Sequence, residues 1–551
     1  MNSRPSTKFS GRWPFLAALG ILISALILLC FTPPVSRDAL THHLLVPKLY
    51  LKHGGFHEIP SIEFSYYPMN LEMLYLVPMY FGSDIVPKYI HLAFGLLTSL
   101  LIFGYLKKRL GSIYPYFGAL FFLSIPIVVK LAITAYVDLG LAFFTTASLF
   151  LLFRWVEHSF RLRDLVFSAI MCGLALGTKY NGLIAFLLLT LSTAILYERG
   201  HGKAGRHPLG AVTSAALFVF TALVIFSPWM IRDLIWTNNP IYPLFDHLFN
   251  SSRENGGTFL NEFTIRTYLY KEKWWEIALI PIRMFFQGQD GNPRLFDGKL
   301  NPFLLILPIL AFAAPGTDKE EVKVEKGILA LFSALFFVFA YFGGGMRIRY
   351  IVPALPALAV LSTFGLARFT KWVERHLGKG RLFPQLIPSL LTLLVFFPNA
   401  RYLHAQFLYV RPLDYMSGRV TRDAYIERYR HEYPAMQYIN GSLPGGSKVL
   451  FVFVGKRVYF CDRDYVLDME GTQSFLQDLA AESRGGKGVL SGLEAEGITH
   501  LLVNHLIFEK WLNYSLNQEE RNIILNFINH YTKLLFKNKE YIVLKLIDPE
   551  K

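Results

Sequence analysis

The segment Ser36-Arg-Asp-Ala-Leu-Thr-His-His-Leu-Leu-Val-Pro-Lys48 directly follows a hydrophobic run from Trp13 to Phe31. The run is long enough to cross a bilayer, which takes about 20 apolar residues per helix. It is longer than the apolar region of a cleaved signal peptide and lacks a small-x-small cleavage site, so we expect it to remain as the first span. The polar segment that follows therefore lies at a membrane surface.

This polar segment predicts an amphipathic helix. If residues 37–52 are helical, Asp38 and His42 share one face, because residues four apart are neighbours on a helix. Leu40 and Leu44 then lie on another face. We interpret the segment as a helix in the membrane interface with a carboxylate in its first turn.

The composition excludes several classes of protein. The chain has 551 residues, of which 53% are hydrophobic and 15% aromatic, and this is too apolar for a soluble enzyme of that length. The net charge of +15 belongs mostly to short loops between apolar runs, where it sets membrane topology, so we expect no nucleic-acid partner. Three isolated cysteines imply no disulfide framework.

Eleven hydrophobic runs predict a polytopic α-helical membrane protein with about eleven spans. The expected spans are residues 13–31, 86–106, 112–131, 135–153, 164–178, 181–197, 209–230, 302–315, 327–342, 350–367 and 382–398. The apolar stretch from Trp275 to Phe286 is too short to cross a bilayer, and we interpret it as a second interfacial helix.

Alternate loops are rich in lysine and arginine. The basic sets are Arg4/Lys8/Arg12, Lys107/Lys108/Arg109, Arg154/Arg161/Arg163, Arg199/Lys203/Arg206, Lys319/Lys323/Lys326 and Arg368/Lys371/Arg375/Lys379/Arg381. The positive-inside rule places these loops in the cytoplasm. We therefore expect a multi-pass protein of the bacterial inner membrane with a cytoplasmic N-terminus. The first loop (residues 32–85), residues 231–301 and the C-terminus face outside.

Soluble patterning begins near Arg401. Buried strands are expected at 448–454, 499–504 and 541–546, and helices at 472–482 and 517–536. We therefore divide the chain into a transmembrane domain, residues 1–400, and a small periplasmic α/β domain, residues 401–551.

Two acids on the expected outer side are candidate catalytic groups. Asp38 follows the first span, and Asp138 opens a later span. An ionisable group at a membrane boundary indicates a functional site, and two acids can divide the roles of general base and orienting group. For Asp38 the alternative is a partner of the helix dipole. Asp38 and His42 have the spacing to bind a divalent metal together, with a purely interfacial histidine as the alternative.

Three cations also lie on the side that the positive-inside rule disfavours: Arg347 and Arg349 in a Gly-rich loop, and Lys179 in Gly177-Thr-Lys-Tyr-Asn-Gly182. A lipid phosphate explains them, because arginine grips phosphate oxygens with charge-assisted hydrogen bonds. The alternative is that their heads extend from helix ends into water.

These features together resemble the GT-C superfamily of integral-membrane glycosyltransferases, and most closely the aminoarabinose transferases and protein O-mannosyltransferases. The resemblance covers roughly residues 10–400. The motifs that carry it are Asp38, Ser65-Tyr66-Tyr67-Pro68, Tyr136-Val-Asp138, Gly177-Thr-Lys-Tyr-Asn-Gly182, Asn239-Pro-Ile-Tyr-Pro243 and Arg349-Tyr-Ile-Val-Pro-Ala-Leu-Pro356. The chain departs from many relatives at Ala39, where they have Glu, and the resemblance does not extend to the C-terminal domain.

The resemblance implies that Asp38 is the catalytic base and Asp138 the second acid. It also implies a polyprenyl-phosphate sugar as donor, inversion at the sugar, and a lipid, glycan or protein acceptor. We assign Arg349, Arg347 and Lys179 to the donor phosphate. Substrate binding is assigned to His42, Tyr66, Tyr67 and Glu72.

Two other functions fit the sequence. A transporter has many spans and buried charge, but it typically shows internal repeats and broken helices, which are not evident here. A non-catalytic assembly factor for surface polysaccharide is the second alternative, and loss of activity on changing Asp38 to Asn separates it from an enzyme.

Overall fold

The computed structural model describes residues 11–201, 207–250, 262–313, 318–342, 345–377, 382–468 and 474–550. The chain forms two compact units, which we describe separately. The helical unit comprises Met1–Thr32, Tyr67–Leu244 and Leu260–Leu413. The sheet unit comprises Pro33–Tyr66, Phe245–Phe259 and Asp414–Lys551. The first part of the first loop therefore belongs to the same unit as the C-terminal region.

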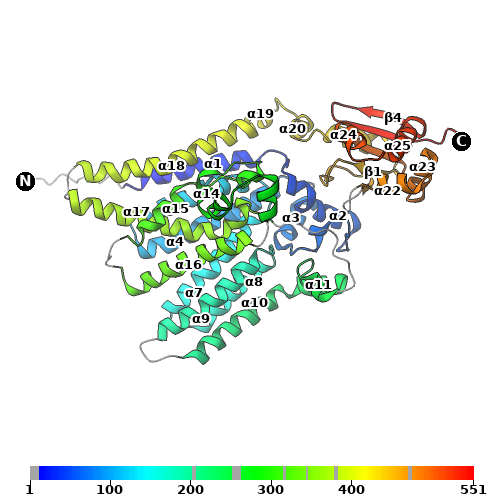
Figure 1. The fold of residues 1–551 in the computed structure, drawn as a ribbon. Helices are drawn as coiled ribbons and strands as arrows, with labels where there is room; N and C mark the ends of the chain where they lie inside the picture. The colour runs from blue at the N-terminus through cyan, green and yellow to red at the C-terminus, as the bar shows by residue number, and fades with distance from the viewer. Residues whose placement is uncertain are drawn as a thin grey trace, which may run out of the picture. The chain divides into compact units, whose positions relative to one another are not determined.

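The helical unit contains long helices that run side by side (Figure 1). They and the shorter helices between them are α1 (Trp13–Cys30), α3 (Asn70–Tyr80), α4 (Val86–Arg109), α5 (Tyr114–Ser124), α6 (Pro126–Ala132), α7 (Asp138–Glu157), α8 (Leu162–Leu176), α9 (Gly182–His201), α10 (Pro208–Thr237), α12 (Glu262–Thr264), η3 (Ile265–Leu269), α13 (Trp274–Ala278), α14 (Ile280–Gln287), η4 (Pro293–Leu295), α15 (Phe303–Leu310), α16 (Glu320–Phe342), η5 (Ile348–Ala354), α17 (Leu355–Leu377) and α18 (Leu382–Val410). Helix α19 (Pro412–Met416) contains the boundary between the units.

Within the described residues, eight helices are long and apolar enough to cross a membrane. A ninth span results if α5 and α6, which meet at a 65° bend, are counted as one. The multi-span helical fold expected from the sequence is thus confirmed. Two of the eleven expected spans are shorter than the length that crosses a bilayer, because α8 has 15 residues and α15 has 8. The expected interfacial helix near Trp275 is two short helices, α13 and α14.

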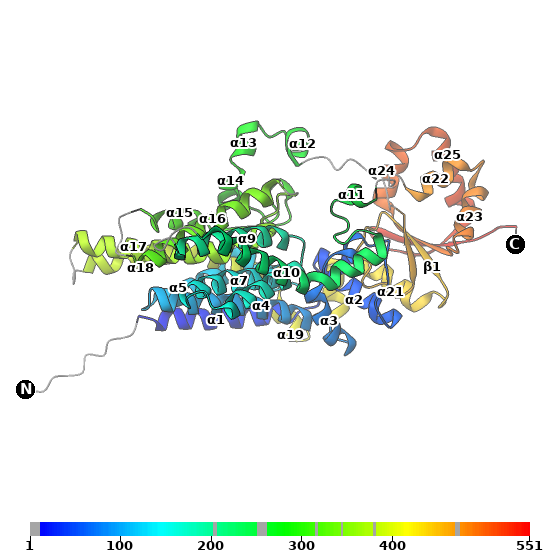
Figure 2. The ribbon, with the colours of Figure 1, turned by 90° about the horizontal axis from the view of Figure 1, so that it is seen from below.

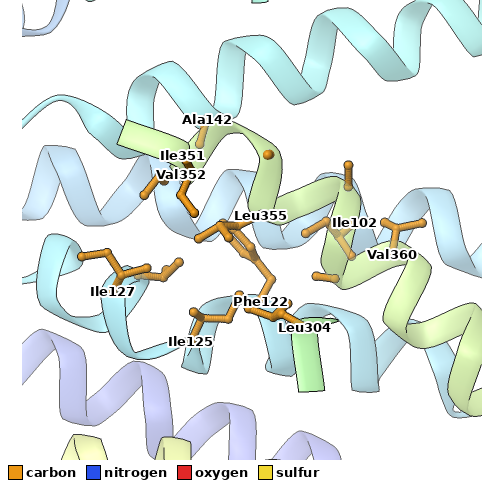
Figure 3. Close-up of a cluster of buried hydrophobic side chains, with 14 of the residues drawn as sticks. Ile102, Phe122, Ile125, Ile127, Ala142, Leu304, Ile351, Val352, Leu355 and Val360 are labelled. Carbon is orange, nitrogen blue, oxygen red and sulfur yellow. The ribbon is translucent and has the colours of Figure 1, made fainter. Parts of the chain in front are cut away.

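A buried apolar cluster holds the helical unit together (Figure 3). Ile102 of α4, Phe122 of α5, Ala142 of α7 and Leu355 of α17 are all at most 1% exposed. Helix α7 packs against α4, α8 and η5, while α17 packs against α15, α16 and α5. The N-terminus of α7 and the segment η5 are therefore fixed next to each other inside this unit.

Several residues of the basic loops form ion pairs. Arg109 at the end of α4 donates to Glu325 of α16 and to Glu157 of α7. Because these charges are largely buried, each needs its partner. Of the residues in the basic sets, Arg4, Lys8, Lys203, Arg206, Lys379 and Arg381 lie outside the described residues.

The sheet unit is built on a five-stranded mixed sheet of order β2-β1-β3-β5-β4. Strands β1 (Lys448–Val452), β2 (Asp464–Leu467) and β3 (His500–Asn504) are parallel, and β5 (Tyr541–Leu546) and β4 (Thr532–Lys537) add antiparallel pairs. Helices α22 (Phe475–Glu482), α23 (Gly486–Ala495) and α25 (Gln518–Tyr531) lie on one side of the sheet, and α21 (Tyr433–Ser442) lies on the other (Figure 2). Helices α11 (Asp246–Phe249), α20 (Arg422–Tyr429) and α24 (His505–Tyr514) complete this part.

The expected C-terminal α/β fold is thus confirmed, with one local difference. The helix expected over residues 517–536 ends at Tyr531, and its last residues form β4. The other part of the sheet unit, the first loop, contains a π-helix, η1 (Ala39–His43), followed by α2 (Leu45–His53) and η2 (Glu63–Tyr66). The single α-helix expected over residues 37–52 is therefore interrupted. Gly54 ends α2 with a φ of 77°, a conformation that favours glycine.

Candidate active site

The best-defined group of ionisable residues in the helical unit is centred on Asp138. Asp138 is the first residue of α7 and is 1% exposed. Its Oδ1 accepts a hydrogen bond of 2.7 Å from Nζ of Lys179, which lies between α8 and α9. Its Oδ2 has no hydrogen-bond partner among the described residues. Two of the predicted site residues, 41 positions apart, therefore form one buried ion pair.

The turn that carries Lys179 is fixed by Asn70 at the start of α3. The backbone N–H of Asn70 donates to the carbonyl of Gly177 at 2.8 Å, and its side-chain amide donates to the carbonyl of Leu174. A Cβ on residue 177 would lie 2.2 Å from Nδ2 of Asn70, so a larger residue there would displace the Asn70 side chain. Trp229 of α10 completes the arrangement by donating to Oδ1 of Asn70.

The cations expected to hold phosphate gather around Tyr350 of η5. Nζ of Lys179 lies 5.3 Å from the centre of the Tyr350 ring, and the guanidinium of Arg349 lies 5.2 Å from it. Arg349 also stacks over Tyr136, just before α7. Arg347 acts electrostatically on Tyr350 as well. All three predicted phosphate-binding cations are therefore brought together in one unit.

Glu72 on α3 is 3% exposed and acts electrostatically on this same cluster, chiefly through Lys179 and Asp138. Burial raises the pKa of Glu72 from 4.5 to about 8. Glu72 is therefore largely protonated at neutral pH, whereas Asp138 forms an ion pair. With Arg347 and Arg349 counted, the cluster carries two positive charges in excess, which suits an anionic ligand.

The raised pKa of Glu72 predicts a specific pH dependence of stability. Between about pH 5 and pH 8 the folded protein keeps a proton on Glu72 that the unfolded chain releases, so the free energy of unfolding falls as the pH rises. Gln cannot ionise. The free energy of unfolding of Glu72→Gln should therefore fall by a few kcal/mol less than that of the wild type between these two pH values. Thermal unfolding at pH 5 and pH 8 measures it, with the exposed Glu63→Gln as control. Parallel curves for wild type and Glu72→Gln would contradict the assignment.

Sequence reasoning missed two groups that position Asp138. His91 of α4 is fully buried, and its Nδ1 lies 2.9 Å from the carbonyl oxygens of Leu131 and Thr134. Its Nε2 accepts the backbone N–H of Leu139, the second residue of α7. A neutral histidine with the proton on Nδ1 satisfies all these contacts.

The second group is Tyr75, whose hydroxyl donates to the carbonyl of Tyr136. The only sequence signal for these two groups was that each is a polar residue within an apolar run.

A small pocket adjoins Arg347 and Tyr350 of the cationic cluster. Its lining residues are Pro281, Met284, Phe337, Ala340, Tyr341, Met346, Arg347, Tyr350 and Ile351. The lining is apolar except for Arg347 and two tyrosines. The lining therefore combines an apolar wall with a cationic edge.

The remaining predicted site residues are placed as follows. Asp38 immediately precedes η1 in the sheet unit, is half-buried and makes no capping hydrogen bond from its side chain. His42 is buried, with its ring stacked on Phe64 at 4.4 Å. The hydroxyl of Tyr66 donates to Glu58 at 2.6 Å. In the helical unit, the ring of Tyr67 packs against Tyr180, and its carbonyl accepts from Arg232. Their substrate-binding roles stay predictions.

A divalent metal held by Asp38 and His42 stays a prediction. In the described part of the chain, no group of three His, Cys, Asp or Glu side chains is placed to hold a metal ion. These two residues alone fall short of the three or four ligands that a protein metal site usually has.

Residues 74–232 match the family model described as dolichyl-phosphate-mannose-protein mannosyltransferase. The fold matches the crystal structure of ArnT from Cupriavidus metallidurans bound to undecaprenyl phosphate, with a TM-score of 0.57 and 14% identity over 98% of this chain and 99% of that one. The chain has the fold of ArnT. The fold that the sequence motifs led us to expect is thereby confirmed.

The fold also matches that of the archaeal oligosaccharyltransferase AglB from Archaeoglobus fulgidus. In its complex with an inhibitory peptide and a dolichol-phosphate, it matches with a TM-score of 0.51 and 13% identity over 97% of this chain and 74% of that one. An apo form of the oligosaccharyltransferase from the same organism gives a TM-score of 0.54 at 13% identity, over 98% and 75% of the two chains. No curated protein sequence matches significantly.

Proposed function

We propose that this GT-C protein is a glycosyltransferase that moves a sugar from a polyprenyl-phosphate donor to a lipid, glycan or protein acceptor. The observation that carries the proposal is the cluster of Lys179, Arg347 and Arg349 beside an apolar pocket. A polyprenyl phosphate has the matching chemistry, because its head is an anion and its tail is apolar. The bound undecaprenyl phosphate and dolichol-phosphate in the two GT-C structures support the same ligand class.

The reaction needs cations for its leaving group and a base for its acceptor. The acceptor oxygen attacks the anomeric carbon from the side opposite the phosphate, which inverts the configuration of the sugar. The bond from that carbon to the phosphate oxygen breaks, and the polyprenyl phosphate leaves with the bonding electrons. Lys179, Arg347 and Arg349 stabilise the charge that develops on this group. Asp38 takes the proton of the acceptor hydroxyl.

Asp138 has a supporting role in this scheme. Its 2.7 Å ion pair holds Lys179 in one orientation beside Tyr350. A buried carboxylate that already accepts a hydrogen bond from an ammonium is a poor proton acceptor. We therefore assign Asp138 to orienting the phosphate-binding lysine and leave proton abstraction to Asp38.

We also propose that the N-terminus is cytoplasmic in a bacterial inner membrane and that the C-terminal domain is periplasmic. A reporter that is active only in the periplasm is then expected to be active when it is fused after Lys551. The same reporter inserted after Ser159, in a loop expected to be cytoplasmic, should be inactive, because the basic residues near that loop resist translocation. The reverse pattern in intact cells would contradict the orientation.

A direct test of the activity uses the purified full-length protein. Mass spectrometry of lipid-linked sugars that accumulate in a deletion strain identifies a candidate donor, and transfer from that donor is then measured in detergent. Accumulation of a polyprenyl-phosphate sugar, with transfer restored by the protein, is the expected result. Normal lipid-linked sugars in the deletion strain would favour a transporter or an assembly factor instead.

A further inference from the structure

Lys48 of α2 is bound by a segment of the C-terminal region more than 400 residues further along the chain. Its Nζ donates to the carbonyl oxygens of Tyr459 at 2.6 Å and Cys461 at 3.4 Å, and to Oδ1 of Asp462 at 2.7 Å. The ammonium group also lies 5.1 Å from the centre of the Tyr459 ring. An ammonium has three protons, so these three oxygens match its hydrogen-bonding capacity.

Two further contacts tie the first loop to the same unit. Lys52, one turn beyond Lys48, forms a 3.0 Å ion pair with Asp464 at the start of β2. Arg430, next to the end of α20, donates from Nε to the carbonyl of Val35 at 2.5 Å. The loop is therefore attached to the C-terminal region on both sides of Asp38.

The segment that binds Lys48 is itself fixed. Oδ1 of Asn440 on α21 accepts the backbone N–H of Asp462, and its side-chain amide donates to the carbonyl of Phe460, both at 2.8 Å. Arg463 donates to the carbonyl oxygens of Asn440 and Leu443. Because α21 packs on β5 and β4, the carbonyl groups around Lys48 are held by the sheet.

Backbone hydrogen bonds connect the successive turns between Ser36 and Lys48, a segment that includes Asp38. The N–H of Lys48 donates to the carbonyl of Leu44 at 3.0 Å, and the N–H of Leu44 donates to the carbonyl of Ala39 at 2.9 Å. The N–H of Leu40 reaches the carbonyl of Ser36. A short π-helix is rare and often marks a functional position. An external anchor close to η1 therefore matters for the orientation of Asp38.

We infer that the C-terminal domain is the support that positions the catalytic loop, with Lys48 as the positioning residue between the domain and Asp38. This inference rests on the proposed function, because it gives Asp38 the role of base. The domain thus contributes to transfer through the loop that it holds. Small displacements of a catalytic group are costly, and an error of about 1 Å can lower a rate by about a hundredfold.

The test compares two identical changes on one helix, Lys48→Met and Lys52→Met, in the full-length protein. Lys52 pairs with an aspartate whose side chain is 78% exposed, and such surface pairs contribute little. We expect Lys48→Met to lower kcat at least tenfold with an unchanged KM for the lipid-phosphate donor. Lys52→Met removes an exposed ion pair and a 3.4 Å contact with the carbonyl of Asp462, so it should lower kcat clearly less than Lys48→Met.

Hydrogen exchange supplies a measurement that does not depend on activity. In Lys48→Met, the amides of residues 38–45 should exchange at least about tenfold faster, while those of α7 should not change. Asp462→Asn keeps the carbonyl acceptors of Lys48 and should give a smaller effect in the same direction. If Lys48→Met does not fold, hydrogen exchange in Asp462→Asn tests the inference instead.

The results for kcat and for hydrogen exchange distinguish failure of the inference from failure of the proposed function. Wild-type kcat and wild-type exchange in Lys48→Met, or equal losses in Lys48→Met and Lys52→Met, would overturn the inference. If the wild-type protein transfers no sugar from the donor that accumulates in a deletion strain, the proposed function fails. Faster exchange at residues 38–45 in Lys48→Met would then still establish the anchoring.

Discussion

Replacing Asp38 by Asn is expected to lower the rate of sugar transfer by about a hundred- to ten-thousand-fold, the usual contribution of a general base. Asn has nearly the same shape as Asp but cannot accept a proton at neutral pH. Binding of the polyprenyl-phosphate donor should be unchanged, because Lys179, Arg347 and Arg349 are untouched. Steady-state transfer and equilibrium binding of the lipid phosphate, measured on the same preparation, separate the two effects.

The control for this experiment is Glu63→Gln, which removes a carboxylate from an exposed position at the start of η2 in the same loop. It should transfer sugar at the normal rate. A purely structural role for Asp38 predicts a different result, since an acid at a helix terminus contributes only about 0.3–1 kcal/mol to stability. Near-normal transfer by Asp38→Asn would remove this residue from the mechanism.

Asp138→Asn should also reduce transfer, but less severely than Asp38→Asn. The change leaves Lys179 without its 2.7 Å carboxylate partner and lets the lysine adopt other orientations. The donor should therefore bind more weakly, with a smaller loss of kcat than in Asp38→Asn. This pattern of constants distinguishes an orienting group from a base.

The regular elements could be predicted from the sequence wherever hydrophobic patterning is strong. The buried runs that became β1, β3 and β5 gave clear signals, since most of their residues are buried. Strand β2 has four residues at the edge of the sheet and carries little pattern. No glycine or proline separates α25 from β4, so the helical prediction continued through the strand.

The sequence indicated which residues are candidates for the site, but it did not indicate which of them lie together in the fold. Asp138, Lys179 and Arg349 were identified because ionisable groups are rare near spans. That Asp138 and Lys179 form a pair depends on how α7, α8 and α9 pack, which local sequence does not contain. Asn70 and His91 act through hydrogen bonds to backbone atoms in other segments, and such partners leave no trace in spacing or composition.

The first loop shows a similar limit. The period of its apolar residues predicts an α-helix, and α2 fits that pattern. The π-helix η1 adds a residue to one turn, which helical periodicity cannot predict. Its attachment to the C-terminal domain depends on Lys48 and Asp462, which are separated by 414 positions.

Arg349→Ala should chiefly weaken the interaction with the lipid-phosphate donor. A hydrogen bond to a charged group contributes about 1.5–3 kcal/mol, which corresponds to roughly a 10- to 150-fold rise in the KM for the donor and in the Kd of the polyprenyl phosphate. Arg349→Lys keeps the charge but loses the planar fork that matches phosphate, so it should lie between wild type and Arg349→Ala. The expected pattern is the reverse of that for Asp38→Asn, in which kcat falls and binding persists.

Lys323→Ala is the matched control, because it removes one cation from an exposed position on α16, where Lys323 pairs only three residues away with Glu320. Raising the salt concentration should weaken donor binding in wild type more than in Arg349→Ala, since one charge–charge attraction is already absent in the variant. Thermal unfolding identifies any loss that results from the stacking of Arg349 on Tyr136 and Tyr350. If Arg349→Ala and Lys323→Ala, both folded, change donor binding equally little, the phosphate site lies elsewhere.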